Sequence, residues 1–199
     1  MKAQPLLTAA SLALFAAAPA AAQVSVPVGP FRSIELDGGG RALVRYAPVQ
    51  KVRILQGNAR ISSIRVSDRP GSIGRNGNGA RLVIRTCPNR CPMGYRFELM
   101  IETPNLDGLG VVGDGEIEVA PGFPREDSLA VGVKGNGRID AREVTAGRVA
   151  AGVSGDGEIS LGPADALVAG VSGKGRILYR GQPRLTSSVA GGGRIEQAD

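Results

Sequence analysis

The chain has 199 residues with a net charge of +6, and it contains 30 glycines but no histidine and no tryptophan. The absence of histidine excludes the usual general base, the usual zinc ligand and every Ser-His or Cys-His nucleophile pair. Aromatic residues make up only 4% of the sequence, so a core must be filled mainly by Val, Ile, Leu and Ala, which suit stacked β-strands.

Residues 1–22 predict a cleaved secretory signal peptide. Lys2 precedes an apolar run at 6–18, and Ala20, Ala21 and Ala22 supply small residues for cleavage before Gln23. The run is shorter than the roughly 20 apolar residues that a membrane span needs. We therefore expect residues 23–199 to form a single exported domain, in the periplasm or at the cell surface, that does not span the membrane.

The first part of the mature chain, residues 31–103, is predicted to consist of strands and turns. Period-2 alternation predicts short strands at 31–36, 42–46, 51–55 and 61–66. Residues 70–79 contain four glycines and a proline, which predict an exposed loop. An antiparallel hairpin is expected next, with strands at 81–86 and 95–103.

Cys87 and Cys91 lie in the connection of that predicted hairpin. In an exported protein this pair predicts a disulfide, which would fix the hairpin tip and stabilise the fold by about 2 kcal/mol. A redox-active pair is the alternative. Three residues separate the cysteines instead of the two of a thioredoxin-type motif, so the structural interpretation is favoured.

Charge is unevenly distributed along the chain. Residues 31–100 hold thirteen cations and four acids, a net charge of +9, whereas 101–199 hold ten cations and fourteen acids, a net charge of −4. A basic half predicts contact with an anionic envelope polysaccharide or an envelope protein, and Arg81, Arg85 and Arg96 are the candidate anionic-ligand surface. The alternative is that the basic charge has an internal role, with the basic N-terminal turns lying against the acidic C-terminal turns. Nucleic acid is not an expected partner because few aromatics are available for base stacking.

A short phrase, Gly-x-Gly-x-Ile, recurs five times in the C-terminal part, residues 104–199. Its second glycines fall at 115, 137, 157, 175 and 193, with steps of 22, 20, 18 and 18 residues. In the copies at 129–141, 149–161 and 167–179, a strand of alternating apolar residues precedes the corner and a short strand follows it. Repeats of this length indicate one supersecondary unit that stacks on copies of itself.

Stacking of these units predicts an all-β fold, a right-handed parallel β-helix-like solenoid with the N-terminal antiparallel hairpin as an extension. Matching positions should then form ladders with a spacing of about 4.8 Å. The inner ladder is Ile117, Ile139, Ile159, Ile177 and Ile195. The outer ladder, whose charges alternate until its last pair, is Glu116, Arg138, Glu158, Arg176 and Arg194.

Other interpretations of the corners are weaker. A calcium-binding β-roll has a nine-residue period and corner aspartates, whereas the present spacing is twice as long and the corner acid is not kept. A nucleotide-binding site is not expected, because the Gly-x-Gly corners are not predicted to lie between a strand and a helix. A polysaccharide-cleaving β-helix enzyme, a lyase or a glycoside hydrolase, would need clustered carboxylates such as Asp114 and Asp156. A simpler interpretation is that these aspartates accept hydrogen bonds from backbone amides of the corners.

The glycine corner that follows Phe31 and Ile34, the central variable hairpin and the serial Ser-Gly-x-Gly-x-Ile phrases resemble the head GIN domain family over residues 31–197. That family is a domain of unknown function, also labelled an adhesin head. The resemblance implies an exported, β-helix-like envelope protein without established catalytic residues. Two features depart from the pattern: Ala42 follows the first corner where isoleucine is usual, and the Cys87–Cys91 loop is additional.

Together these patterns predict an exported, non-enzymatic envelope protein that acts as a structural or adhesive binding module. The polysaccharide-cleaving enzyme is the alternative. We expect no cofactor, no metal and no catalytic residue. Self-association is a further expectation, because the last turn at Arg194 and Ile195 leaves an unpaired edge.

Overall fold

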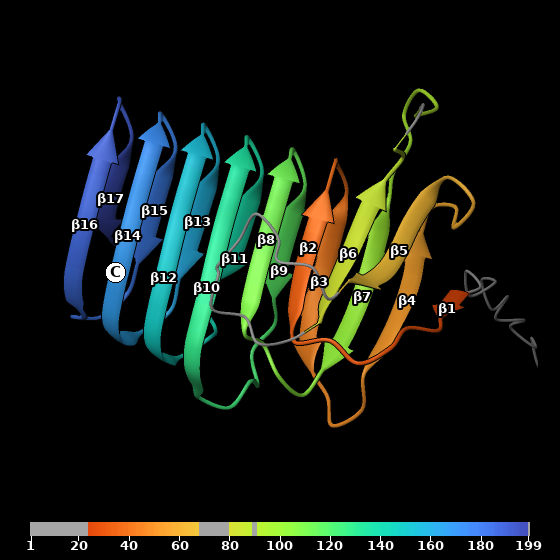
Figure 1. Cartoon of the computed structure of the whole chain (residues 1–199), viewed down its shortest axis with the longest axis horizontal. Helices are drawn as coiled ribbons and strands as arrows, with labels where there is room; N and C mark the ends of the chain where they lie inside the picture. The colour runs from red at the N-terminus through yellow and green to blue at the C-terminus, as the bar shows by residue number, and fades with distance from the viewer. Residues whose placement is uncertain (1–23, 68–79, 89–90, 199) are drawn as a thin grey trace, which may run out of the picture.

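The computed structural model describes residues 24–67, 80–88 and 91–198. The predicted signal peptide at 1–22 and the predicted loop at 70–79 lie outside these ranges. Within them the regular structure consists of β-strands alone, arranged in two sheets (Figure 1). The predicted all-β class is thereby confirmed. No helix of this part of the chain is long and apolar enough to cross a membrane.

One sheet has nine strands and the other has eight. The nine-stranded sheet contains, in spatial order, β1 (Val24–Val26), β4 (Lys51–Gln56), β7 (Glu98–Thr103), β3 (Arg41–Tyr46), β9 (Glu116–Val119), β11 (Arg138–Ala141), β13 (Glu158–Leu161), β15 (Arg176–Tyr179) and β17 (Arg194–Gln197). The eight-stranded sheet contains β16 (Arg184–Ala190), β14 (Ala164–Gly173), β12 (Ala146–Gly155), β10 (Glu126–Gly135), β8 (Gly108–Gly113), β2 (Ser33–Asp37), β6 (Arg81–Thr86) and β5 (Ser62–Ser67).

Each copy of the repeated phrase contributes one strand to each sheet. A strand of the eight-stranded sheet runs into the Gly-x-Gly corner, and a short strand of the nine-stranded sheet follows it (Figure 1). Neighbouring copies pair in parallel and in register, as β10 with β12 and β12 with β14 show. The predicted β-helix solenoid and its handedness stay predictions.

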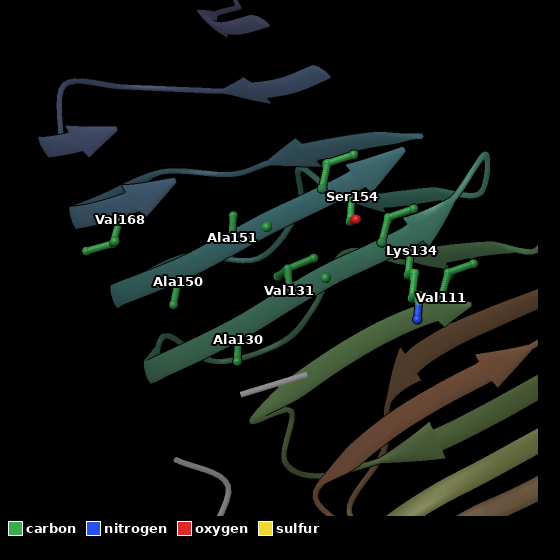
Figure 2. A pocket seen from close by; sticks show the side chains of 12 residues that line it. Val111, Ala130, Val131, Lys134, Ala150, Ala151, Ser154 and Val168 are labelled. Carbon is green, nitrogen blue, oxygen red and sulfur yellow. The ribbon is translucent and has the colours of Figure 1, made fainter. Parts of the chain in front are cut away.

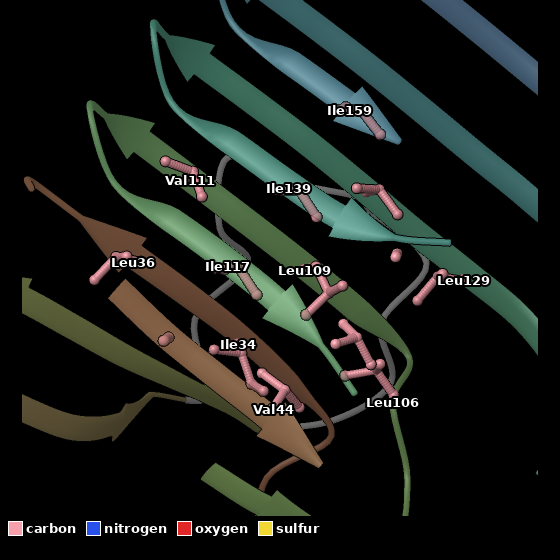
Figure 3. Close-up of a cluster of buried hydrophobic side chains, with 14 of the residues drawn as sticks. Ile34, Leu36, Val44, Leu106, Leu109, Val111, Ile117, Leu129, Ile139 and Ile159 are labelled. Atoms are coloured by element: carbon pink, nitrogen blue, oxygen red, sulfur yellow. The ribbon is translucent and has the colours of Figure 1, made fainter. Parts of the chain in front are cut away.

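The hydrophobic core lies between the two sheets (Figure 3). The predicted inner ladder is confirmed, because each of its isoleucines is aligned with the next on the neighbouring strand. Ile117, Ile139 and Ile159 are fully buried. Burying a side chain of this size stabilises a fold by about 1.5–3 kcal/mol, so the ladder is a major source of stability.

The corner glycines are required by the close approach of successive turns. Gly135 has a φ of +119°, and a Cβ atom there would lie 2.7 Å from the carbonyl oxygen of Gly113 in the preceding turn. At Gly137 a Cβ atom would lie 2.4 Å from Cγ1 of Val111. Only glycine allows both the left-handed backbone at the first position and the backbone contact between turns.

The predicted hairpin of 81–86 with 95–103 is wrong. β6 lies in the eight-stranded sheet, parallel to β2 and antiparallel to β5, whereas β7 lies in the nine-stranded sheet, parallel to β3 and antiparallel to β4. Both strands direct apolar side chains into the same core, Leu82 and Ile84 from one sheet and Leu99 from the other. The chain therefore crosses between the sheets here, as it does at each later corner.

The order of the turns in space differs from their order in sequence. The turn formed by β2 and β3 lies between the β6–β7 turn and the β8–β9 turn. Ala42, which departs from the repeated phrase, is fully buried and is aligned with Leu99 on one side and Ile117 on the other. The degenerate first copy is thus a full member of the inner ladder.

Candidate binding surfaces

Two of the three predicted anionic-ligand residues are paired with carboxylates of the neighbouring strand. Nη1 of Arg81 donates to Oε2 of Glu35 at 2.9 Å, and the two side chains are only 11% and 13% exposed. Nε of Arg85 donates to Oδ2 of Asp37 at 3.1 Å. Because β2 lies directly beside β6, acids of the first turn neutralise these cations.

Arg96 lies apart from the other two predicted residues. It is exposed and precedes β7 of the nine-stranded sheet, whereas Arg81 and Arg85 lie on β6 of the eight-stranded sheet. Its surroundings include Arg41, Glu98 and Glu116, which line the same shallow hollow. The structure therefore does not gather the three arginines on one sheet.

The outer face of the nine-stranded sheet carries the predicted charge ladder. Nη1 of Arg138 lies 2.7 Å from Oε1 of Glu158, and Arg176 pairs with the other oxygen of the same carboxylate. The structure extends the ladder to Arg41, which lies between Glu98 and Glu116. Each pair of opposite charges on adjacent strands stabilises the sheet by about 0.2–1 kcal/mol. The charges of this face therefore help to hold the strands in register.

A second charge cluster on this face surrounds Glu102. Its carboxylate accepts hydrogen bonds from Nη2 of Arg45 at 2.5 Å and from Nη2 of Arg53 at 2.8 Å. The hydrogen bond from Arg45 lowers the pKa of Glu102, burial opposes this effect, and the charges of both arginines add to the lowering. Part of the excess positive charge of the N-terminal turns is therefore neutralised by ion pairs within the fold.

The corner aspartates do not form a cluster of acids. Nδ2 of Asn136 donates to Oδ1 of Asp114 at 2.9 Å, so the side chains of two successive corners bind each other. Asp156, one corner further along, is exposed. In the part of the chain that the structure describes, no group of three or more His, Cys, Asp or Glu side chains is arranged to hold a metal ion.

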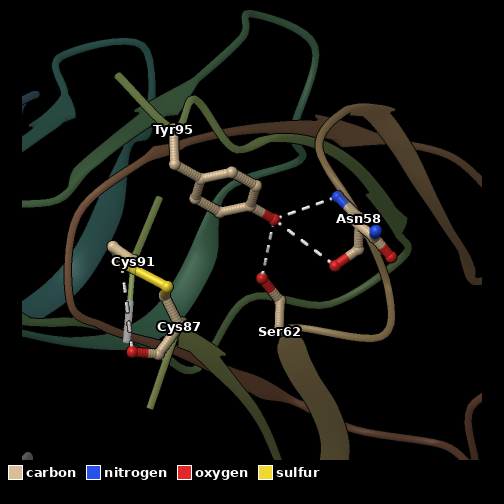
Figure 4. The surroundings of a disulfide bond; sticks show 5 residues. All are labelled: Asn58, Ser62, Cys87, Cys91 and Tyr95. Carbon is tan, nitrogen blue, oxygen red and sulfur yellow. Dashed lines mark hydrogen bonds between the residues drawn. A yellow bond between two sulfur atoms is a disulfide. The ribbon is translucent and has the colours of Figure 1, made fainter. Parts of the chain in front are cut away.

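The predicted disulfide between Cys87 and Cys91 is confirmed (Figure 4). It lies where the chain crosses from β6 to β7, rather than at a hairpin tip. Tyr95 follows it, and its hydroxyl oxygen accepts a hydrogen bond from the backbone N–H of Asn58 at 2.9 Å and lies 3.1 Å from Oγ of Ser62. These bonds attach the crossing segment to the turn between β4 and β5 and to the first residue of β5.

A hollow that was not predicted from the sequence lies on the outer face of the eight-stranded sheet (Figure 2). It has a volume of about 410 Å³, lies over β10 and β12, and extends to Val168 of β14. The outward residues that line it are small or short, namely Ala130, Gly132, Ala150, Gly152 and Ser154, together with Lys134. Val168 is 58% exposed and Ala150 is exposed, whereas Gly132 of β10 is buried, so this apolar surface is open to solvent over β12 and β14.

The glycine in the middle of this face has no role in the packing of the fold. A Cβ atom at Gly152 would meet nothing within 4 Å, in contrast to the corner glycines. Glycine in a strand interior weakens the strand and often marks a place where a ligand or another backbone approaches closely. The repeated Gly-Val-x-Gly at 132–135, 152–155 and 170–173 is the sequence signal that could have revealed this row.

Cations without ion-pair partners border the same face. Lys134, Arg148 and Arg184 are exposed, and no carboxylate of the described residues lies within ion-pair distance of them. Arg148 and Arg184 occupy the same position two strands apart, with Ala166 between them. This arrangement contrasts with the paired charges of the nine-stranded sheet, and it places unpaired positive charge beside the apolar hollow.

Comparison with known proteins supports the resemblance noted in the sequence. Residues 125–183 match the model of a family described as "Putative auto-transporter adhesin, head GIN domain". This confirms the head GIN resemblance over β10 to β15. No match is found among curated proteins.

Several solved structures are similar to this chain. A "putative adhesin" of Bacteroides fragilis is 17% identical with a TM-score of 0.52, over 88% of this chain and 96% of that one. A "putative cell adhesion protein" of Clostridium sporogenes is 13% identical with a TM-score of 0.42, over 88% and 99%. At this level of identity the Bacteroides fragilis structure supports a shared fold alone, and the Clostridium sporogenes structure carries no argument.

Proposed function

From the head GIN match over residues 125–183, we propose that the chain is an exported, non-enzymatic binding module of the cell envelope. Residues 23–199 act as one domain, a right-handed parallel β-helix, in the periplasm or at the cell surface after removal of residues 1–22. The apolar N-terminal segment followed by small residues supports export. The adhesin descriptions of the family and of the similar fold support a binding role.

The proposed ligand is an anionic envelope polysaccharide, and the proposed contact surface is the outer face of β10, β12 and β14. The observation that carries this proposal is the hollow over β10 and β12, which is exposed at Ala150 and Val168 and bordered by the unpaired cations Lys134, Arg148 and Arg184. Sugar rings would lie flat on the Ala and Gly surface, and their carboxylates would approach the cations. Arg81 and Arg85 contribute less, because a polyanion would have to compete with Glu35 and Asp37.

Binding of a linear polyuronate, measured by isothermal titration calorimetry, tests this proposal. We expect affinity to fall strongly between about 50 and 200 mM salt, because screening weakens contacts between exposed charges. Replacing Lys134, Arg148 and Arg184 together by Gln should weaken binding. The matched control replaces Arg138 of β11, together with Arg142 and Arg180, which follow β11 and β15, by Gln. It makes the same change in net charge and should have little effect.

Shape can be tested separately from charge. Gly152→Val adds a β-branched side chain within the hollow, at a position where a Cβ atom has open space. We expect reduced polyuronate binding with unchanged folding. Affinity that does not depend on salt, or equal loss of binding in the two triple variants, would contradict the proposed surface. Release of reducing ends that is lost in Asp114→Asn or Asp156→Asn would favour the enzyme instead.

A further inference from the structure

The last turn of the stack is uncovered in both sheets. β16 ends the eight-stranded sheet and β17 ends the nine-stranded sheet, at the same end of the molecule (Figure 1). In the turn before, Leu167 and Val171 are 1% and 4% exposed, whereas the aligned Leu185 and Val189 are 41% and 48% exposed. Core positions and backbone edges are therefore open at this end, within the described residues.

The opposite end of the stack is protected in the usual ways. β1, at the edge of the nine-stranded sheet, has only three residues. β5, at the edge of the eight-stranded sheet, pairs antiparallel and carries the exposed Arg65. Short edge strands and charges on an edge discourage pairing with another chain. β16, by contrast, has seven residues with Arg184 as its single charged residue, so the two ends differ in their readiness to pair.

The outer charge ladder is also incomplete at the open end. Arg194 is aligned with Arg176, where every earlier pair in the ladder joins opposite charges. Glu196 lies two residues further along β17, on the same face. Within the chain these two side chains are 3.9 Å apart and are 74% and 51% exposed, so their contact is weak.

We propose that a second copy of this chain covers the open end, through antiparallel pairing of β17 with its counterpart about a twofold axis at Ile195. This register places Arg194 of each copy opposite Glu196 of the other. It also brings the two Ile195 side chains together, which continues the inner ladder across the axis. A twofold contact of this kind is closed, so it yields a dimer and not a fibre.

The outer-face surface of β10, β12 and β14 stays accessible in this dimer, because the contact uses the end of the stack. Two copies joined end to end would therefore double the proposed polysaccharide-binding face. The dimer does not depend on that function, and each can fail without the other.

Sedimentation equilibrium of residues 23–199 across a range of concentrations tests the pairing. We expect a monomer–dimer equilibrium. Arg194→Glu and Glu196→Arg, each alone, should raise the dimer dissociation constant by about fivefold or more, since two attractive pairs become repulsive. The double variant Arg194→Glu with Glu196→Arg should restore the dissociation constant to within about twofold, because the pairing of opposite charges is re-formed.

Lys134→Glu provides the matched control, with the same charge change as Arg194→Glu on a strand far from the open end, and should leave the dimer unchanged. Circular dichroism establishes that each variant is folded. A chain that stays monomeric, single variants that dimerise as wild type does, a double variant that stays weak, or open-ended growth would each overturn the proposal. Amide hydrogen exchange in β17 should slow with increasing protein concentration, and exchange independent of concentration would also overturn it.

Discussion

At the scale of single residues, steric contact separates the glycines that the fold requires from those that it does not. A Cβ atom at Gly137 would lie 2.4 Å from Cγ1 of Val111 and 2.7 Å from the carbonyl oxygen of Gly115, whereas one at Gly152 has open space. We expect Gly137→Ala to lower the free energy of unfolding by about 1–3 kcal/mol through overpacking. Gly152→Ala should be neutral or stabilising by about 0.5–1 kcal/mol. Urea unfolding of both variants measures this contrast, and equal effects would contradict it.

The pH dependence of folding contains a contribution from Glu102. Its pKa is lowered in the folded chain, mainly by the hydrogen bond from Arg45. A lowered pKa adds stability above the unfolded value of about 4.3, and this stability is lost as pH falls through the folded value. Wild type should therefore lose stability relative to Glu102→Gln when pH falls from about 6 to 3. Parallel melting-temperature curves for the two proteins over this range would contradict the assignment.

Residue positions that belong to the repeated phrase could be predicted, and long-range partners could not. The isoleucine and charge ladders follow from the spacing of identical phrases, because parallel strands in register align equivalent residues. The pairing of Arg81 with Glu35 could not be foreseen, since it depends on β2 lying beside β6. The surface near Gly152 was missed because Gly152 lies outside the Gly-x-Gly-x-Ile phrase.

At the scale of elements, the inner ladder predicts a gradient of stability along the stack. Ile159 is fully buried between aligned isoleucines, whereas Ile195 has such a neighbour on one side within the described residues. We expect Ile159→Ala to destabilise by about 2–5 kcal/mol through lost burial and a cavity. Ile195→Ala should cost clearly less at a protein concentration where the chain is monomeric. Chemical denaturation of the two variants measures the difference, and equal costs would argue against the ladder.

The predicted strands were largely placed correctly along the chain, but their partners in the N-terminal part were not. Alternation marks where a strand lies, and it does not distinguish a hairpin from a crossing between two sheets that share one core. β7 alternates with apolar side chains directed inward, and β6 buries Leu82, Val83 and Ile84 in succession, so both read as strands but neither pattern identifies the strand's partner. Their partners are instead set by the insertion of the β2–β3 turn between the β6–β7 and β8–β9 turns.

At the scale of the whole molecule, the outer face of β10, β12 and β14 differs in its charges from the outer face of the nine-stranded sheet. The nine-stranded sheet pairs its arginines with glutamates along the charge ladder and around Glu102. The eight-stranded sheet combines a small-residue surface over β10, β12 and β14 with the unpaired Lys134, Arg148 and Arg184. This asymmetry, and not the overall net charge, distinguishes the face proposed for ligand binding.

The outer-face hollow, the charge ladder and the open end all depend on successive turns lying on one another in register. Disulfide trapping tests this most directly, in a background with Cys87→Ser and Cys91→Ser. Ala150 is aligned with Val168 on the adjacent strand, and Val168 with Thr186 on the next. Ala150→Cys with Val168→Cys should form a disulfide under mild oxidation, whereas Ala150→Cys with Thr186→Cys, two strands apart, should not. Efficient crosslinking of the second pair without the first would contradict the in-register stack.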